Sequence, residues 1–331
     1  MAAPETGASG EHDLIARYFR PLATDPGAFD LIDDAATLNV GGDDLVVTTD
    51  AIVAGVHFLP DDPAGTVARK ALRVNLSDLA AKGAEPAGFV LTLALKVVDD
   101  GWLRAFADAL GEDIAAYNVP LLGGDTVSTP GPLMVSVTAF GRVPPGKTVR
   151  RAGAAAGDFV AVTGTIGDAV AGLRLLKQSD GPAKISGEDH AFLVDRYRLP
   201  KPRLAAAGAV RSYATAAMDV SDGLAGDLGK LCSASGVSAD IEIAEIGLSR
   251  AVRAALDAGI VDIKSLLTGG DDYEILCTVP PHNWDAFRSE VVATGIAVSR
   301  IGVVTAGSGE PRFLAAGGEV AELNSRSFSH F

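Results

Sequence analysis

The chain has 331 residues, of which 48% are hydrophobic and 21% are charged, and its formal net charge is −14. This composition excludes a disordered chain and provides enough apolar residues for two domains with separate cores. The negative charge repels nucleic acids and anionic membranes, so we expect neither as a partner. An anionic substrate would need a cation to bring it in, and metal ions are the obvious candidates.

Three features predict a soluble cytoplasmic protein. Cys232 and Cys277 lie in apolar sequence, as buried thiols of a reducing compartment do. Residues 1–13 show no basic region followed by an apolar block, so we expect no secretory signal. The longest apolar run, residues 88–95, is too short to cross a bilayer.

In the first half of the chain, the spacing of apolar residues changes between the periods of helices and strands. It predicts helices over residues 11–22, 66–82 and 102–117, and strands over residues 45–50, 88–97, 120–126 and 132–141.

The stretch from Leu45 to Asp50 predicts a short buried strand that ends in Thr48, Thr49 and Asp50. Mg²⁺ prefers oxygen ligands of this kind, together with substrate phosphates. The same pattern also describes a strand that ends in an ordinary polar turn. Recurrence favours the metal site, because acidic residues follow apolar runs or open helices again at positions 33–34, 78, 125, 219, 222 and 271–272.

Three of these places fit a metal or phosphate site when they are taken together with the other carboxylates. Asp33 and Asp34 are adjacent carboxylates, which repel each other unless water or a cation separates their charges. Asp78 interrupts the apolar stripe of a predicted helix, where an unpaired charge would be costly. Gly123 and Gly124 predict a turn before Asp125 that would let the backbone approach a phosphate, although paired glycines also mark ordinary turns.

Residues 141–148 match the P-loop pattern, but we reject that interpretation. A P-loop binds phosphate with consecutive backbone N–H groups and then opens a helix. Pro144 and Pro145 have no N–H to donate. The next predicted strand begins at residue 159, which leaves no room for the helix.

The second half mixes strands and helices without strict alternation. It predicts strands over residues 159–163, 216–219, 239–243, 273–276 and 298–304, and helices over residues 168–176, 190–197, 202–212, 224–232, 249–258 and 284–294. Asp222 would serve as an ordinary helix cap, but Asp219 is not needed for capping. The order predicts an α/β (α+β) protein with two mixed sheets, each covered by helices on one face.

Over nearly its full length the chain resembles the thiamine-monophosphate kinase family. The resemblance runs through short motifs in the same order, at residues 10–11, 33–36, 48–50, 55–58, 70–78, 123–125, 162–168, 218–224, 269–273 and 330–331. It implies the fold of aminoimidazole ribonucleotide synthetase, in which the N-terminal sheets of two subunits form a β-barrel across a homodimer. Residues 1–150 would then bind ATP and metal and dimerise, and residues 151–331 would complete the active-site cleft.

The resemblance also implies a reaction, in which ATP donates its γ-phosphoryl group to thiamine monophosphate and thiamine diphosphate forms. The acceptor is a phosphate whose second pKa is about 6, so it is largely ionised at neutral pH and needs no general base. The difficulty is to bring two polyanions together, which depends on positioning and on neutralising charge. Several Mg²⁺ ions bound by aspartates would do both. The number of Mg²⁺ ions and a need for K⁺ stay open.

The site residues implied by the resemblance fall into three groups. The metal ligands are Asp34, Thr48, Thr49, Asp50, Asp78, Asp125, Asp219 and Asp222, of which Asp50, Asp78, Asp125 and Asp222 also count as catalytic. The nucleotide contacts are Gly124, Asp125, Arg151 and Ser221. The contacts to the thiamine moiety are His57, Asp271 and Phe328, since a carboxylate and an aromatic face suit its cationic ring.

Four positions depart from the family pattern. Ile32 stands where the family usually has Gly, Asp271 where it often has Glu, and Phe328 where it often has Trp. Ala107 stands where relatives have an aromatic residue that contacts adenine. These departures concern the thiamine and adenine contacts and leave the carboxylate set unchanged.

Other functions remain as alternatives. Selenophosphate synthetase would need an early reactive Cys, and the hydrogenase maturation relative ends in a Cys, whereas this chain has no Cys before Cys232 and ends in Phe331. Another enzyme of the same fold, such as aminoimidazole ribonucleotide synthetase, is an alternative on fold alone, but the block from Thr48 to His57 argues against it. A non-catalytic protein that binds Mg²⁺ and nucleotide is the alternative from a different class, although a pure binder would not need the whole carboxylate set.

Overall fold

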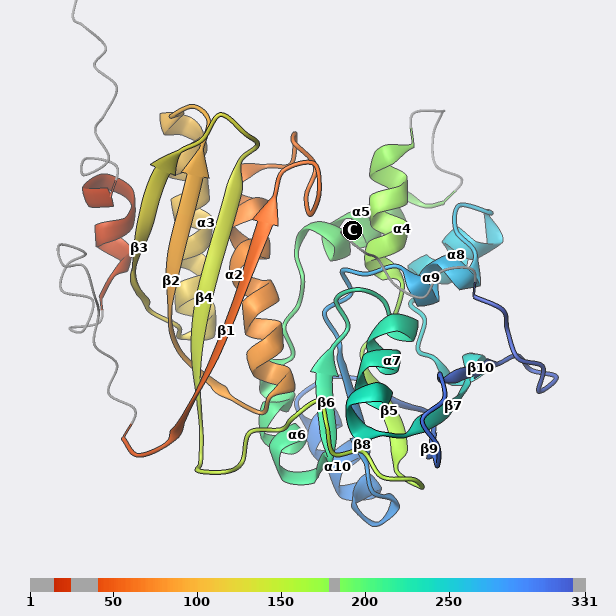
Figure 1. Cartoon of the computed structure of the whole chain (residues 1–331). Helices are drawn as coiled ribbons and strands as arrows, with labels where there is room; N and C mark the ends of the chain where they lie inside the picture. Colours follow the sequence, from red (N-terminus) through yellow and green to blue (C-terminus); the bar gives the residue numbers. More distant parts are fainter. Residues whose placement is uncertain (1–14, 25–40, 179–184, 324–331) are drawn as a thin grey trace, which may run out of the picture. The chain divides into compact units, whose positions relative to one another are not determined.

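The computed structural model describes residues 15–24, 41–178 and 185–323. The chain divides into two compact units. The first comprises Met1–Asn75 and Pro86–Arg142, and the second comprises Leu76–Glu85 and Val143–Phe331. Each unit contains one sheet with its own helices (Figure 1).

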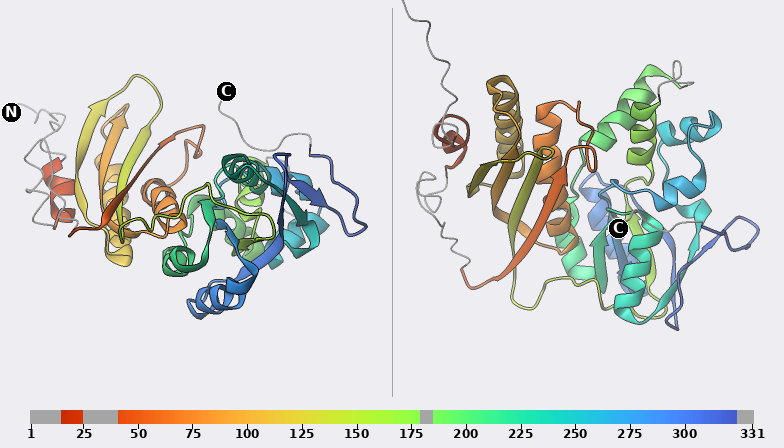
Figure 2. Two further views of the ribbon diagram at one scale, coloured as in Figure 1. Left: turned by 60° about the horizontal axis from the view of Figure 1, so that its bottom comes forward. Right: turned by 45° about the horizontal axis from the view of Figure 1, so that its top comes forward.

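The first unit is a four-stranded sheet in the order β1-β4-β2-β3. Its strands are β1 (Asp44–Val53), β2 (Glu85–Leu95), β3 (Leu121–Ser128) and β4 (Met134–Val143). Its helices are α3 (Asp100–Tyr117) and α2 (Ala64–Ala81), whose last residues, from Leu76 on, belong to the second unit. Alternate residues of β4 are buried because both helices cover the same face of the sheet, as the views in Figures 1 and 2 show. The predicted helices and strands between residues 66 and 143 are thus confirmed within a few residues.

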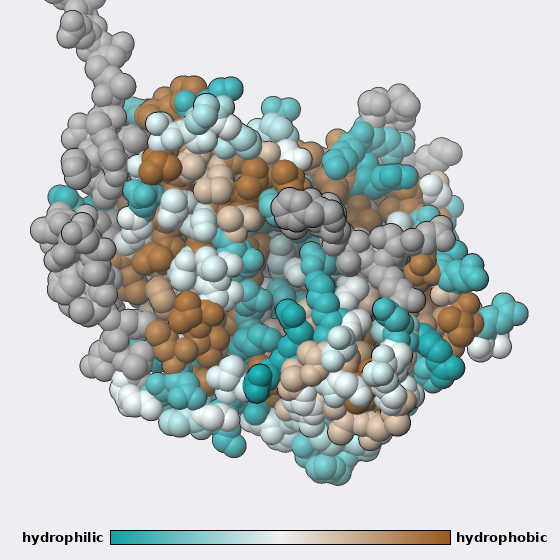
Figure 3. Space-filling model, viewed as in Figure 1, coloured by the Kyte–Doolittle hydropathy of each residue, from teal (hydrophilic) through white to brown (hydrophobic). Residues whose placement is uncertain are grey.

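The other face of this sheet carries exposed apolar side chains. Leu45, Val47 and Val127 are 42%, 54% and 43% exposed. Figure 3 shows hydrophobic side chains gathered over the strands of this unit. An apolar face of this kind typically marks a surface that binds another protein.

The second unit is a six-stranded mixed sheet in the order β10-β7-β9-β5-β8-β6. Its strands are β5 (Phe159–Thr163), β6 (Ala216–Asp219), β7 (Ser238–Glu242), β8 (Ile275–Val279), β9 (Val298–Thr305) and β10 (Arg312–Leu314). Its helices are α4 (Asp168–Lys177), α5 (Gly187–Arg198), α6 (Ala207–Tyr213), α7 (Leu224–Ser235), α8 (Arg250–Asp257), α9 (Ile263–Thr268) and α10 (Trp284–Ala293). Most pairs are antiparallel, whereas β10 pairs with β7 in parallel.

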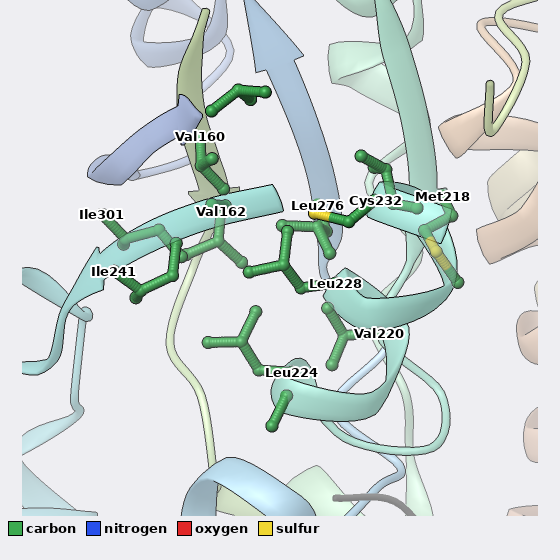
Figure 4. Close-up of a cluster of buried hydrophobic side chains, with 14 of the residues drawn as sticks. Val160, Val162, Met218, Val220, Leu224, Leu228, Cys232, Ile241, Leu276 and Ile301 are labelled. Carbon is green, nitrogen blue, oxygen red and sulfur yellow. The ribbon is translucent and has the colours of Figure 1, made fainter. Parts of the chain in front are cut away.

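Helices cover both faces of this sheet, so the prediction of helices on one face is wrong for the second unit. Val160 and Val162 of β5 pack with Leu228 of α7 in one core (Figure 4). Ala161, between them, packs with Phe287 of α10 in another. All five residues of β8 are buried, as expected for a strand enclosed on two sides.

Three further expectations have clear outcomes. Ile15–Phe19 forms a π-helical turn and Arg20–Leu22 a 3₁₀ turn, so the described part of the predicted first helix is not a regular α-helix. No helix follows Thr148, since the next regular element of the chain is β5, and this confirms the rejection of the P-loop. Cys232 and Cys277 are buried free thiols, as predicted.

Candidate active site

Two acidic motifs of the second unit fold against each other. The backbone N–H of Asp271 donates to the carbonyl of Ser221 (2.9 Å), and that of Tyr273 donates to the carbonyl of Val220 (2.8 Å). An added Cβ at Gly270 would lie 2.0 Å from the Ser221 carbonyl oxygen, so this contact requires glycine. Two motifs that are distant in the sequence therefore form one structure.

Asp219 and Asp222 flank the first of these loops. β6 ends at Asp219, which is buried. α7 begins at Leu224 with Gly223 at its N-cap, and no side chain caps it. Asp222 is therefore not a helix cap. Instead, its Oδ2 lies 2.5 Å from the Nζ of Lys230.

Asp227, which the sequence prediction missed, holds the same loop in shape. Its Oδ2 accepts the backbone N–H groups of Ser221 (3.0 Å) and Asp222 (2.9 Å), and its Oδ1 accepts from Lys230 (2.8 Å). Burial raises the pKa of Asp227, while the hydrogen bond from Lys230 acts in the opposite direction. The available signal was an acidic residue in the first turn of a helix, which does not reveal the loop that it binds.

Lys82, also missed, lies among three predicted site residues. It follows the last residue of α2, one turn after Asp78, and its Nζ donates to the Ala217 carbonyl on β6 (2.9 Å). Burial lowers the pKa of Lys82, the negative charges of Asp78 and Asp219 raise it, and Arg151 lowers it further. The charges of Asp78, Asp219 and Arg151 therefore all act on one ammonium group of the second unit.

Backbone hydrogen bonds hold the segment that carries Arg151. The N–H of Val149 donates to the carbonyl of Lys82 (3.1 Å), and the N–H of Ala217 donates to the carbonyl of Arg150 (2.9 Å). The segment is therefore anchored to both the end of α2 and β6, and Arg151 itself is exposed. A permanently charged guanidinium on an anchored segment is suited to bind phosphate.

The acidic pair Asp271-Asp272 is split between two roles. Asp271 has a φ of +74°, which is rare outside glycine and occurs often at functional sites, and its Oδ1 accepts the hydroxyl of Tyr273 (3.2 Å). Asp272 is buried, and its Oδ2 accepts the N–H of Gly167 at the start of α4 (2.7 Å). Burial raises the pKa of Asp272 well above its ordinary value. Asp272 is therefore structural, and Asp271 is the partly exposed member.

A buried ion-pair network supports this loop. Glu274 is fully buried, and its Oε1 lies 2.9 Å from the Nη2 of Arg196. Its Oε2 accepts from the Nε of Arg203 (2.6 Å) and from the Thr163 hydroxyl (2.8 Å). The Nε of Arg196 also lies 3.5 Å from Asp168. These contacts fix Glu274, and with it the backbone that follows Asp271.

In the first unit, Thr48, Thr49 and Asp50 lie within β1 and not at its end. β1 continues to Val53 and is largely exposed because it is an edge strand with one uncovered face, so the prediction of a short buried strand ending at Asp50 is wrong. Strand alternation places Thr48 and Asp50 on one face and Thr49 on the other. The Thr49 hydroxyl donates to the Val137 carbonyl (3.1 Å).

Asn75 of α2 ties Asp50 to the helix layer. The buried side chain of Asn75 accepts the backbone N–H of Asp50 (3.1 Å) and donates to the Ala71 carbonyl (3.0 Å). This explains why an amide interrupts the apolar stripe of α2. It also means that the backbone of Asp50 is held by the helix layer.

Gly124 and Asp125 lie inside β3, so the prediction of a double-glycine turn is wrong. An added Cβ at Gly124 would lie 1.7 Å from the Leu91 carbonyl oxygen on the parallel strand β2. The glycine is therefore explained by strand packing. Asp125 is exposed opposite Thr92, and its Oδ1 accepts the N–H of Thr126 (2.8 Å).

Asp50 and Asp125 lie at opposite edges of this sheet, on β1 and β3. Three interstrand steps separate them, or about 14 Å. They also lie on opposite faces, because Asp50 shares its face with the buried Ile52, whereas Asp125 shares its face with the exposed Val127. Within a single first unit these two carboxylates cannot bind one metal ion.

His57 is fixed by two hydrogen bonds in a loop after β1. Its Nδ1 accepts the N–H of Val53 (3.0 Å), and its carbonyl accepts from the buried Nζ of Lys70 (2.8 Å). Because Nδ1 accepts a hydrogen bond, the proton of the neutral imidazole lies on Nε2.

The remaining predicted positions either lie outside the described residues or are buried. Asp34, Phe328 and Ile32 lie outside the described residues. Ala107 is buried in α3, so it presents almost no surface to a base.

Within residues 15–24, 41–178 and 185–323, no three His, Cys, Asp or Glu side chains come together as a ready-made metal centre. In the second unit the predicted carboxylates lie beside ammonium groups instead, Asp78 and Asp219 near Lys82 and Asp222 against Lys230. Across the same described part of the chain, no helix is long and apolar enough to cross a membrane.

Comparisons with known proteins match both units. Residues 32–143 match the family described as AIR synthase related protein, N-terminal domain, and residues 155–313 match its C-terminal domain. A thiamine-monophosphate kinase from Caulobacter vibrioides is 47% identical over 314 residues, which cover 93% of this chain and 88% of the relative.

Two solved structures are similar over most of their length. The crystal structure of thiamine-monophosphate kinase from Stenotrophomonas maltophilia is 38% identical, with a TM-score of 0.78, and the match covers 88% of this chain and 90% of that one. A structure described as AaThiL complexed with AMPPCP and TMP is 30% identical, with a TM-score of 0.77, and the match covers 90% and 91% of the two chains.

Proposed function

Because the chain belongs to the thiamine-monophosphate kinase family, we propose that it transfers the γ-phosphoryl group of ATP to thiamine monophosphate, giving thiamine diphosphate and ADP. One observation in the second unit supports this proposal. The charges of Asp78, Asp219 and Arg151 all act on the pKa of Lys82, so the second unit combines carboxylates with a phosphate-binding cation. The similar protein solved with AMPPCP and TMP binds ligands of the expected kinds.

The proposed metal is Mg²⁺, and the residues present fit it. The donors are carboxylate and hydroxyl oxygens, with no thiolate or imidazole among them. We propose as ligands the set Asp34, Thr48, Thr49, Asp50, Asp78, Asp125, Asp219 and Asp222, of which Thr49 is the one that strand alternation turns to the opposite face from Thr48 and Asp50. Bound Mg²⁺ would neutralise charge on the donor and acceptor phosphates.

The other residues would bind and orient the substrates. Arg151 would bind a phosphate of ATP with two parallel N–H groups, and Gly124 would let nucleotide approach β3. The Ser221 backbone N–H and carbonyl are already bonded to Asp227 and Asp271, so its hydroxyl is the group left to contact nucleotide. His57 would donate a hydrogen bond from its Nε2 to thiamine monophosphate.

Asp271 and Phe328 would bind the thiamine moiety. The carboxylate of Asp271 would pair with the positive thiazolium ring, and Phe328 would present an aromatic face to it. Neither residue needs to transfer a proton, because the acceptor phosphate is already largely ionised at neutral pH. The chain's contribution to the reaction is therefore positioning and charge neutralisation.

We also propose that the enzyme is a homodimer whose first-unit sheets form a barrel. The uncovered face with exposed Leu45, Val47 and Val127 supports it. Residues 1–150 would then bind metal and ATP and dimerise, and residues 151–331 would complete the site.

Changing Val47 to Asp should disrupt this dimer. Val47 is 54% exposed on the uncovered face, so a charge there is tolerated by the monomer but costs a buried interface several kcal/mol. Light scattering after size exclusion should show a monomer with native circular dichroism. Val292→Asp is the matched control, because Val292 is 50% exposed in the second unit. A dimeric Val47→Asp protein would contradict the barrel.

Incubation with ATP, Mg²⁺ and each of three acceptors tests the function. We expect thiamine diphosphate from thiamine monophosphate, no phosphorylation of free thiamine, and no ADP with formylglycinamidine ribonucleotide. Chromatography of the thiamine esters is the measurement. ADP formation with formylglycinamidine ribonucleotide alone would favour the aminoimidazole ribonucleotide synthetase alternative, and nucleotide binding without any turnover would favour the non-catalytic one.

A further inference from the structure

Lys230 is in direct contact with a carboxylate that we propose as a metal ligand. Its Nζ lies 2.5 Å from Oδ2 of Asp222 and 2.8 Å from Oδ1 of Asp227. The ammonium group therefore holds an oxygen that a divalent cation would need.

The two contacts of Lys230 differ in how firmly they are fixed. The side chain of Asp227 is 0% exposed and also accepts the backbone N–H groups of Ser221 and Asp222. The side chains of Lys230 and Asp222 are 39% and 34% exposed. Lys230 can therefore leave Asp222 for solvent without breaking the buried bonds that hold Asp227 in place.

Lys230 remains charged at neutral pH. Burial is the largest single influence on its pKa and lowers it, but the hydrogen bonds and charges of Asp222 and Asp227 together outweigh burial and leave the pKa raised. The pair of nearby carboxylates would otherwise repel each other, and the ammonium between them removes that repulsion.

We propose that the ammonium group of Lys230 is a tethered cation that binds the Asp222 carboxylate until a divalent cation displaces it. Lys230 is then a positioning residue for the metal site. This inference rests on the proposed role of Asp222 as a metal ligand. Before metal binds, Lys230 keeps the Asp222 carboxylate oriented. When metal binds, Lys230 stays on Asp227 and releases Asp222.

A consequence concerns the order of binding. A divalent cation that enters without nucleotide must displace the ammonium and also meets its repulsion. ATP adds phosphate oxygens as ligands, which offset that cost. Lys230 therefore weakens metal binding to the nucleotide-free enzyme and makes the metal enter chiefly with ATP.

Calorimetric titration of the metal-free full-length enzyme with Mn²⁺ alone tests this inference. Lys230→Met should bind Mn²⁺ about fivefold more tightly than wild type, the size expected when one partly exposed ion pair no longer competes. Lys230→Arg should restore affinity close to wild type. Lys264→Met, which removes an exposed positive charge from α9, is the control and should change nothing. Damage to the fold would weaken metal binding, so a gain in affinity is specific.

Unchanged or weaker Mn²⁺ binding by Lys230→Met would overturn the inference, and Lys230→Gln provides the same test if the methionine variant does not fold. Weaker AMPPCP binding with unchanged Mn²⁺ binding would also overturn it, because Lys230 would then be a phosphate contact. The variant Asp222→Asn tests the proposed role of Asp222 as a metal ligand separately from the inference on Lys230. Unchanged Mn²⁺ binding by Asp222→Asn would remove Asp222 from the metal site and the inference with it, whereas a loss there without a gain in Lys230→Met would overturn the inference alone.

Discussion

Replacing Asp50 with Asn should lower kcat about 10³-fold, the size typical for loss of a charged group that stabilises a transition state. The substitution keeps the size of the side chain and removes one oxygen ligand with its charge. The fold should not change, because Asp50 is exposed and its backbone N–H, not its carboxylate, binds Asn75. Steady-state kinetics with ATP and thiamine monophosphate are the measurement.

Asp44→Asn is the matched control for this prediction. Asp44 is exposed on β1 and on the same face as Asp50, so the substitution removes an equal charge from the same strand. Its kcat should stay within about twofold of wild type, as for most surface substitutions. Near-normal turnover by Asp50→Asn would show that Asp50 is not a ligand.

Replacing Arg196 with Met should destabilise the second unit by about 3–5 kcal/mol, because removal of one partner leaves an uncompensated buried charge. Arg196 is buried and lies 2.9 Å from Glu274 and 3.5 Å from Asp168. The loss should appear in urea unfolding as a lower midpoint with an unchanged slope. Turnover should also fall, since Glu274 follows the loop that contains Asp271.

Arg174→Met provides the comparison on a neighbouring helix. Arg174 is exposed on α4, so its loss should change the free energy of unfolding by about 0.5 kcal/mol or less. Equal midpoints for the Arg196 and Arg174 variants would mean that the buried network does not stabilise the fold.

Local apolar periodicity was enough to predict most of the fold. α3 and β4 follow the helical and strand periods because each has one buried and one more open face. The glycines of β3 were misassigned because Gly124 is required by the neighbouring strand and not by a turn. The second layer of helices on the six-stranded sheet had a signal in the continuous apolar run of β8, which is typical of a strand buried on both faces.

The candidate site was predictable where residues act through their own chemistry and not where they act through distant contacts. Asp219 stood out because no helix cap requires it. Lys82, Asp227 and Lys230 were missed because their roles depend on a strand, a loop and a carboxylate that the fold brings to them. Nothing local distinguishes Asp271 from its buried neighbour Asp272, because their difference arises from the N-terminus of α4.

We propose Asp50 and Asp219 as members of one set of ligands for divalent ions that bind together with ATP. Counting Mn²⁺ ions bound per chain in the presence of AMPPCP tests this most directly, in wild type, Asp50→Asn, Asp219→Asn and the double variant. We expect each single variant to lose bound Mn²⁺, and the double variant to lose no more Mn²⁺ than the single variant that binds fewer ions. Wild-type numbers of bound Mn²⁺ in both single variants, or losses that simply add in the double variant, would contradict it.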